Sequence, residues 1–442
     1  MGSKLQKIHA QGAGIDVGSR QFFVGIENQE VKSFDTFTSG CYQVVEYLQQ
    51  HFITSVAMEA TGVYWITLHD MLREVGIAVD VVNGRHVKHV PGRKTDVKDC
   101  MWISELHSYG LLKKSFIPEA PVKEMRHYMR LRENHIEQKV KAVQRMDKAL
   151  VMMNIRLSSV VSDIQGQSSL RIIQAILKGE RHADVLLTLC DKRILKRKAK
   201  QMQECLKGFY KPEQLFALKQ SWEQYEFSEK QIADCDVCIE KLMETLTINK
   251  PEPVLNEKPK RIYHNKPNVK NLHKMVQQLY DGKDLTVLPG ITSYSLLKFF
   301  SVTGNDLKNW KTENHFTAWL GLAPNQYQSG KMKKYRRIKM NTEAGQILKE
   351  CVQPLLRSKH VALGVFGKRI SSRRGPSIAI KAMARKLACW IYRMVNNGLA
   401  FVENGIKQYE ERQKKDTQKW LEKKAKELNL ILTPCKARGG VH

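Results

Sequence analysis

The sequence predicts an α/β domain with a mixed β-sheet, a long helical arm and a mainly α-helical C-terminal domain. Short apolar segments alternate with amphipathic ones near the N-terminus, apolar residues then recur at heptad spacing, and a Pro- and Lys-rich stretch follows. The predicted boundaries are 1–118 for the α/β domain, 119–250 for the arm, 251–284 for a linker, 285–400 for the C-terminal domain and 401–442 for a helical tail.

The N-terminal elements follow the order β-β-β-α-β-α-β. A turn at Gly18, Ser19 and Arg20 makes the first two strands antiparallel, whereas the later helical connections require parallel strands. This is the element order of the ribonuclease-H-like fold, in which the first strand is central and pairs with the fourth. The predicted elements are strands 13–17, 22–26 and 31–37, helix 42–50, strand 54–59, helix 64–75 and strand 77–82.

Four acidic residues stand at the ends of predicted elements. Asp16 lies in the first strand, Glu59 ends the fourth, and Asp96 and Asp99 begin a helix whose later residues are apolar. Desolvating a lone carboxylate costs several kcal/mol, so clustered ones favour divalent cations. We therefore expect a two-metal phosphodiester site with Mg²⁺, or alternatively Mn²⁺. Taken singly, Asp96 is also explained by a helix N-terminus and Glu59 by an exposed strand end.

The charge balance points to a polyanionic partner. The chain has 73 Lys and Arg against 44 Asp and Glu, a net charge of +29. Nucleic acid is the leading candidate, because no apolar run reaches the roughly 18 residues of a membrane span and 1–11 lacks a signal-peptide core. We expect a cytoplasmic, DNA-associated protein that does not enter membranes.

The nine cysteines do not predict a disulfide framework. Their number is odd and they are spread from Cys41 to Cys435, so we expect reduced thiols. The close pair Cys235 and Cys238 has no second ligand pair at zinc-finger spacing. Small core residues on a helix are the preferred interpretation of this pair.

Two heptad seams predict a coiled-coil arm with a break near 166–179. The alternative is an ordinary helical domain without a partner chain. The seam residues are Ile136, Val140, Val143, Leu150, Met153 and Leu157, and then Leu215, Leu218, Trp222, Tyr225, Ile232, Ile239 and Leu246.

The predicted C-terminal domain, 285–400, contains sequence patterns that are typical of nucleic-acid contact. The turn 288–291, followed by a helix over 295–302, resembles a helix-hairpin-helix element, in which backbone amides approach a phosphate. A predicted loop over 325–330 leads into a basic strip, residues 331–339. Tyr327 and Tyr335, interleaved with it, could stack on bases. The alternative is a solvated basic face. The candidate nucleic-acid-binding residues are Arg93, Lys94, Lys331, Lys333, Lys334, Arg336, Arg337, Lys339, Arg373 and Arg374.

Ser329 stands at the head of the basic strip. A serine hydroxyl is a weak nucleophile unless a base or a metal takes its proton, and no histidine stands nearby in the sequence. On the residues alone, Ser329 is an ordinary polar loop residue.

Several longer segments resemble one family. Asp16 with the segments 59–62, 90–100 and 109–112 resembles the DEDD transposases of the one-ten family of insertion sequences. The segments that resemble the second domain of its eleven-eleven branch are 321–324, 329–331, 358–364, 382–388 and 409–410.

The resemblance implies a RuvC-like nuclease domain, an arm that assembles a homo-oligomer and a serine-containing transposase domain. It assigns metal binding and catalysis to Asp16, Glu59, Asp96 and Asp99, and makes Ser329 the nucleophile that becomes linked to DNA. It also implies a non-coding guide RNA, called a bridge or seek RNA, that pairs with donor and target DNA in a prokaryotic cell.

Three functions follow as hypotheses. The leading one is an RNA-guided recombinase that excises and inserts its own element through a serine-linked intermediate. The second is a RuvC-like junction resolvase or nuclease that only hydrolyses DNA. The third is a packaging protein for RNA or DNA, which the clustered carboxylates disfavour.

Overall fold

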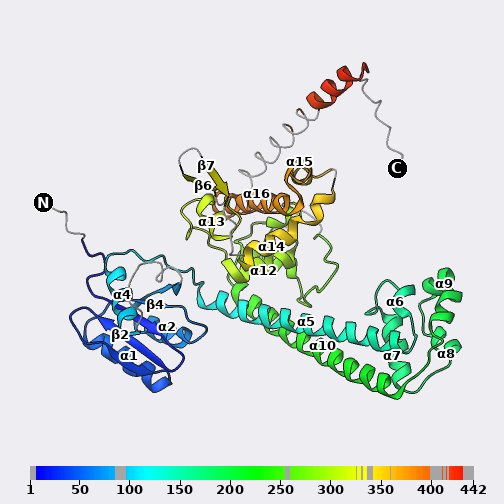
Figure 1. Cartoon of the computed structure of the whole chain (residues 1–442), viewed down its shortest axis with the longest axis horizontal. Helices are drawn as coiled ribbons and strands as arrows, with labels where there is room; N and C mark the ends of the chain where they lie inside the picture. The colour runs from blue at the N-terminus through cyan, green and yellow to red at the C-terminus, as the bar shows by residue number, and fades with distance from the viewer. Residues whose placement is uncertain are drawn as a thin grey trace. The chain divides into compact units, whose positions relative to one another are not determined.

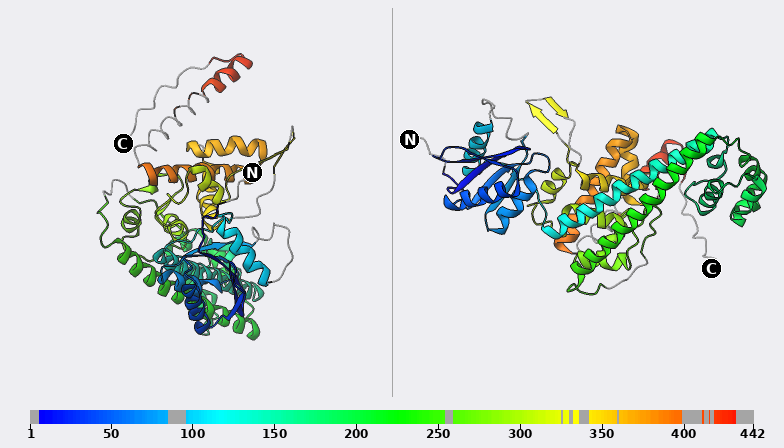
Figure 2. Two further views of the ribbon diagram at one scale, coloured as in Figure 1. Left: turned by 90° about the vertical axis from the view of Figure 1, so that its left-hand side faces the viewer. Right: turned by 90° about the horizontal axis from the view of Figure 1, so that it is seen from below.

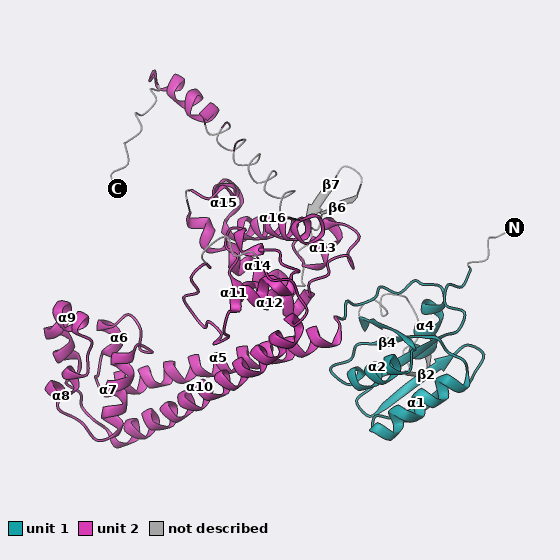
Figure 3. Ribbon diagram, turned by 180° about the vertical axis from the view of Figure 1, so that it is seen from behind, with its two compact units in different colours: residues 1–117 teal, residues 118–442 magenta. Residues whose placement is uncertain are grey.

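The computed structural model of the chain divides into two compact units, Met1–Ile117 and Pro118–His442 (Figure 1, Figure 3). For 96–98, 326–329 and 332–335 the backbone alone is described. The described residues are 6–84, 96–253, 259–324, 326–329, 332–335, 342–358, 360–398, 411, 415 and 418–431.

A five-stranded mixed sheet with the order β3-β2-β1-β4-β5 forms the centre of the first unit. β1 pairs antiparallel with β2 and parallel with β4, so the first strand is central and adjoins the fourth, as the sequence predicts. The elements are β1 (Gly12–Val17), β2 (Gln21–Ile26), β3 (Lys32–Asp35), α1 (Thr38–Gln50), β4 (Ser55–Glu59), α2 (Trp65–Glu74), β5 (Ala78–Val82) and α4 (Asp96–Ser108).

Helices cover both faces of this sheet, because successive strand residues point to opposite sides. Ile15 belongs to the main core, together with Val44 of α1 and Leu68 of α2. Gly14 faces α4, where an added Cβ would lie 2.2 Å from the carbonyl oxygen of Cys100. Only a glycine at this position lets α4 approach β1 so closely.

Two long helices, α5 (Ala120–Met152) and α10 (Pro212–Thr247), run alongside each other in the second unit (Figure 2). The predicted seam residues Ile136, Leu218 and Ile239 are buried. Both helices belong to one chain, so their apolar seams cover each other within a single molecule. Assembly of the arm with another chain stays a prediction.

Two predicted seam positions near the end of α5 are wrong. Val140 is 40% exposed, while Ala142 and Met146 are fully buried. Leu157 lies beyond α5, because Asn154 has a φ of 58° and ends the helix. The heptad pattern therefore predicts the helix pair but not every contact residue.

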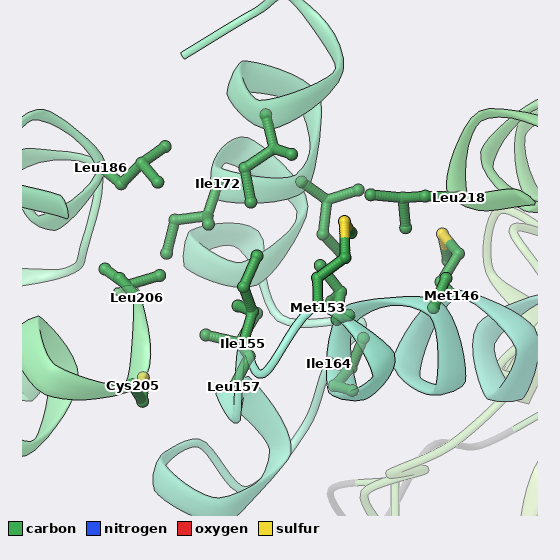
Figure 4. Close-up of a cluster of buried hydrophobic side chains, with 14 of the residues drawn as sticks. Met146, Met153, Ile155, Leu157, Ile164, Ile172, Leu186, Cys205, Leu206 and Leu218 are labelled. Carbon is green, nitrogen blue, oxygen red and sulfur yellow. The ribbon is translucent and has the colours of Figure 1, made fainter. Parts of the chain in front are cut away.

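A small helical domain connects α5 to α10, where the sequence predicts only a break. We call it the arm tip, residues 155–211. Its core joins Ile172, Leu186 and Cys205 of three short helices to the ends of α5 and α10 (Figure 4). The helices are α6 (Leu157–Val160), α7 (Gln167–Leu177), α8 (Ala183–Thr188) and α9 (Lys192–Cys205).

The C-terminal part of the second unit is mainly helical, as predicted. In α16 (Pro376–Asn397) an apolar stripe at helical spacing, Ala379, Met383, Leu387 and Ile391, is fully buried. The other helical elements are α11 (Leu272–Leu279), η1 (Leu285–Val287), α12 (Ser293–Thr303), α13 (Glu313–Trp319), α14 (Glu343–Val352), η2 (Pro354–Arg357) and α15 (Ala362–Arg374).

Polar contacts fix the base of α5 to these helices. Arg126 donates to the carbonyl oxygen of Val302 at 2.7 Å, at the end of α12. The buried Arg132 forms an ion pair with Asp236 of α10 and donates to the Tyr294 hydroxyl at 2.9 Å. The base of the arm is therefore held to the C-terminal helices.

The predicted loop 325–330 contains a strand. β6 (Gln326–Ser329) pairs antiparallel with β7 (Met332–Tyr335), with Ser329 opposite Met332. Ser329 is therefore in a strand and not in a loop.

Two further segments differ from the sequence-based expectation. The stretch 251–284, assigned to a linker, includes α11, whose Met275 and Val276 are buried. In the turn proposed to approach a phosphate, Gly290 faces α14 instead: an added Cβ would lie 2.3 Å from the carbonyl oxygen of Cys351. Its φ of 80° and this close packing explain the glycine.

Within the described part of the chain, we find no helix with the length and apolarity needed to span a bilayer.

Candidate active site

Asp16 and Glu59 lie on the same face of the sheet in adjoining strands. The parallel register pairs Ile15 of β1 with Met58 of β4, and the two acids are the next residues of these strands. Ile15 and Met58 belong to the main core, so their successors face the opposite side, which α4 covers. Both acids are partly buried.

Asp99 of α4 approaches the same place. Burial raises the pKa of the neighbouring Cys100 thiol to about 11, and the negative charges of Asp16 and Asp99 act in the same direction. Asp99 directly precedes Cys100, whose carbonyl oxygen packs against Gly14 of β1, two residues before Asp16. Three of the four predicted acids therefore gather between α4 and the ends of two parallel strands.

Gly84, just after β5, makes room for the Glu59 carboxylate. A Cβ added to Gly84 would lie 1.8 Å from Oε1 of Glu59 and 2.4 Å from its Cδ. The backbone does not require a glycine there, because the φ of Gly84 is not positive. The sequence analysis missed this residue, since nothing in the local pattern links it to Glu59.

The fourth acid, Asp96, is the first residue of α4, and its side chain lies outside the described residues. Arg93 and Lys94, predicted to contact phosphate, also lie outside them. The structure therefore describes three of the four predicted acids in full and only the backbone of the fourth.

The predicted residues of the second unit are placed less completely. Ser329, Lys333 and Lys334 lie in the hairpin strands, where the backbone alone is described. Arg373 and Arg374 are exposed in the last turn of α15, a favourable place for cations on any helix. The predicted positions outside the described residues are Lys331, Arg336, Arg337 and Lys339.

The gathered carboxylates fit a hard divalent cation. Mg²⁺ and Mn²⁺ prefer oxygen ligands, and Asp16, Glu59 and Asp99 offer them from three different elements. The space beside Gly84, which a side chain would fill, accommodates the Glu59 carboxylate. The ligand atoms of these three acids do not all lie within 4.8 Å of one another. Among the described residues, one group of His and Asp side chains does bring its potential ligand atoms that close together.

That group consists of His9, Asp80 and His107, which no sequence motif indicated. The rings of His9 and His107 stack with their centroids 4.4 Å apart. The group adjoins the starts of β1 and β4, because an added Cβ on Gly12 would lie 3.0 Å from His107 and Ser55 is hydrogen-bonded to it. It therefore lies at the opposite strand ends from Asp16 and Glu59.

Protein groups already surround the potential ligand atoms of this cluster. Nε2 of His107 is 3.0 Å from the Ser55 hydroxyl, and Lys114 Nζ is 2.7 Å from Oδ2 of Asp80. Burial, and then the charge of His9, lower the pKa of His107 to about 4, although Asp80 opposes this shift. We interpret the group as a buried polar cluster that holds the N-terminal segment to the sheet.

Two segments of the chain match family models of transposases. Residues 13–155 match the DEDD transposase model of the IS110 family, a range that contains all four acids. Residues 282–362 match the model described as transposase of the IS116/IS110/IS902 family, a range that contains Ser329. A search of curated proteins returned no match.

These matches support a function as a DNA transposase or recombinase. More particularly, the chain carries an IS110-family DEDD transposase domain and a second transposase domain of the IS116/IS110/IS902 family. Its substrate is therefore DNA.

Proposed function

We propose that the protein is an RNA-guided transposase that excises and inserts an insertion sequence through a covalent serine–DNA intermediate. The observation that supports the catalytic part is that Asp16 and Glu59 share the face of the sheet against which α4, the helix of Asp99, packs.

Asp16, Glu59, Asp96 and Asp99 would hold Mg²⁺, or Mn²⁺, which when bound supplies Lewis-acid stabilisation of phosphodiester oxygens. The remaining chemistry belongs to the chain. The Ser329 oxygen attacks phosphorus, and the new Oγ–P bond forms as a P–O bond of the DNA backbone breaks. The serine proton leaves to a nearby base or to water, and the released strand end becomes a hydroxyl.

This route conserves the phosphoester bond. A strand hydroxyl later attacks the serine-linked phosphate, joins the new strand and returns the serine to its starting state. Because Ser329 and the acids belong to different units, the reaction requires the two units to meet, within one chain or between two copies.

Asp99→Asn tests the catalytic part, because it removes a charge with little change in shape. We expect divalent-dependent cleavage to fall by about 100-fold or more, equivalent to several kcal/mol of transition-state stabilisation. DNA affinity should change little, because basic residues carry it. Glu46→Gln, which alters an exposed acid of α1, is the matched control and should keep full activity. Normal recombination by Asp99→Asn would contradict the assignment.

The proposal of RNA guidance rests on the resemblance of the sequence segments to the one-ten family. RNA binding alone would not support it, because a protein of net charge +29 binds any polyanion. Copurified RNA is therefore informative only after a wash at high salt, which removes non-specific contacts. A discrete species encoded beside the gene is the expected result. Random fragments of cellular RNA would contradict guidance and favour the packaging function.

A further inference from the structure

The positive charge of the arm is concentrated at its tip. Residues 155–211 contain twelve Lys and Arg but five Asp and Glu. The long helix α10, in contrast, contains three lysines and eight acidic residues. The basic excess of the tip is therefore a local feature and not a uniform property of this basic chain.

Helix α9 holds the densest part of this charge. One side of the helix is anchored, because Met202 and Cys205 are buried in the core of the tip and Leu195 packs against it. Lys198, at a kink in the helix, donates to the Val160 carbonyl at 2.7 Å. The exposed basic residues are Lys192, Arg193, Lys196, Arg197 and Lys200.

These exposed cations have little internal compensation. Across the described segments, the structure gives no ion pair to Lys192, Lys196, Arg197 or Lys200, and Arg193 has only a 3.8 Å contact with the exposed Asp191. Such crowding of like charges is unfavourable by itself, and a polyanion along the helix would relieve it.

We propose that α9 binds the phosphate backbone of double-stranded DNA away from the point of strand exchange. This surface goes beyond the proposed catalytic function and depends only on DNA being the substrate. The α9 sequence contains no aromatic residue, so it lacks the stacking groups with which proteins hold single strands. Fixed cations on a preformed helix suit the regular backbone of a duplex.

The length of the arm places α9 far from the C-terminal helices that hold the base of the arm. α5 has 33 residues, a length of about 50 Å, and its base is fixed to α12 through Arg126 and Val302. The tip core lies at the other end of α5, around Met146 (Figure 1, Figure 4). DNA held near the C-terminal helices would therefore have to extend about 50 Å, roughly one and a half duplex turns, to reach α9, which favours flanking duplex as the ligand.

The test is the salt dependence of binding of the full-length protein to a long duplex of random sequence. In Lys192→Gln/Lys196→Gln/Lys200→Gln, the slope of log K against log salt should become less steep by about 2.7, since each phosphate contact contributes about 0.9. The matched control is Lys219→Gln/Lys230→Gln/Lys241→Gln, three exposed lysines of α10, and it should keep the wild-type slope.

Replacing Lys192, Lys196 and Lys200 with arginine keeps the charge and should preserve the slope, which excludes misfolding as the cause. An unchanged slope in the glutamine variant would overturn the proposal. So would an equal change in the α10 control, or a change seen with double-stranded RNA and not with DNA.

Discussion

The carboxylate of Glu59 occupies the space that a side chain at Gly84 would fill, with only 1.8 Å between Oε1 and the position of an added Cβ. Glu59 and Gly84 lie at the ends of the paired strands β4 and β5. The glycine therefore controls where one proposed metal ligand can lie.

Gly84→Ala should displace the Glu59 carboxylate without unfolding the domain, because the clash involves the end of a flexible side chain. We expect Mg²⁺ affinity, measured by calorimetric titration, to fall by about 10- to 100-fold, the usual effect of disturbing a ligand's support. The melting temperature should change little.

The control for that substitution is a double-mutant cycle with Glu59→Gln. If Gly84 acts through the Glu59 carboxylate, Gly84→Ala should add little once that charge is removed. Full additivity of the two losses in Mg²⁺ affinity would show that Gly84 acts elsewhere.

His107 should make the protein less stable in mild acid. Its pKa is lowered from 6.5 to about 4 in the folded chain, so between these values the unfolded state binds the proton more readily. Stability is therefore lost as pH falls from about 6.5 towards 4, by roughly 3 kcal/mol at most.

Thermal unfolding at pH 7 and pH 5 measures this effect. His107→Gln, which keeps a polar group near Ser55, should reduce the difference between the two melting temperatures. His264→Gln removes an exposed histidine and should behave like the wild type. The same pH dependence in all three proteins would show that His107 is not responsible.

The buried pair of Arg132 and Asp236 should be costly to break on one side only. Arg132→Met leaves the Asp236 carboxylate buried, with the backbone N–H of Asn268 at 2.9 Å as a remaining donor. The substitution should lower the free energy of unfolding by about 3 to 5 kcal/mol. The double variant Arg132→Met/Asp236→Leu should recover much of this loss in urea unfolding. A double variant as unstable as Arg132→Met alone would contradict this account.

The sequence predicted the sheet well because its signals are local. Alternation of apolar residues indicates the strands, and the likeness of their order to the ribonuclease-H-like fold predicts that β1 adjoins β4, which brings Asp16 beside Glu59. Asp99 followed from its place on an apolar helix that had to pack on that sheet. These are consequences of periodicity and chain connection.

The missed features depend on contacts between residues far apart in the chain. Gly84 and the cluster of His9, Asp80 and His107 have no local pattern, since their meaning arises only when separate elements pack. The wrong prediction for Val140 has a related cause: a heptad stripe identifies a helix face, but small shifts near the end of α5 decide which side chains enter the core.

In the proposed reaction, Ser329 and the carboxylate site together break and rejoin DNA. A denaturing gel of labelled DNA, incubated with Mg²⁺ and the wild type, Ser329→Ala or Asp99→Asn, tests this reaction. We expect a protein–DNA adduct that survives denaturation with the wild type alone, and rejoined product only where the adduct forms. Free cleaved ends without an adduct, together with equally fast cutting by Ser329→Ala, would contradict it and identify a hydrolytic nuclease.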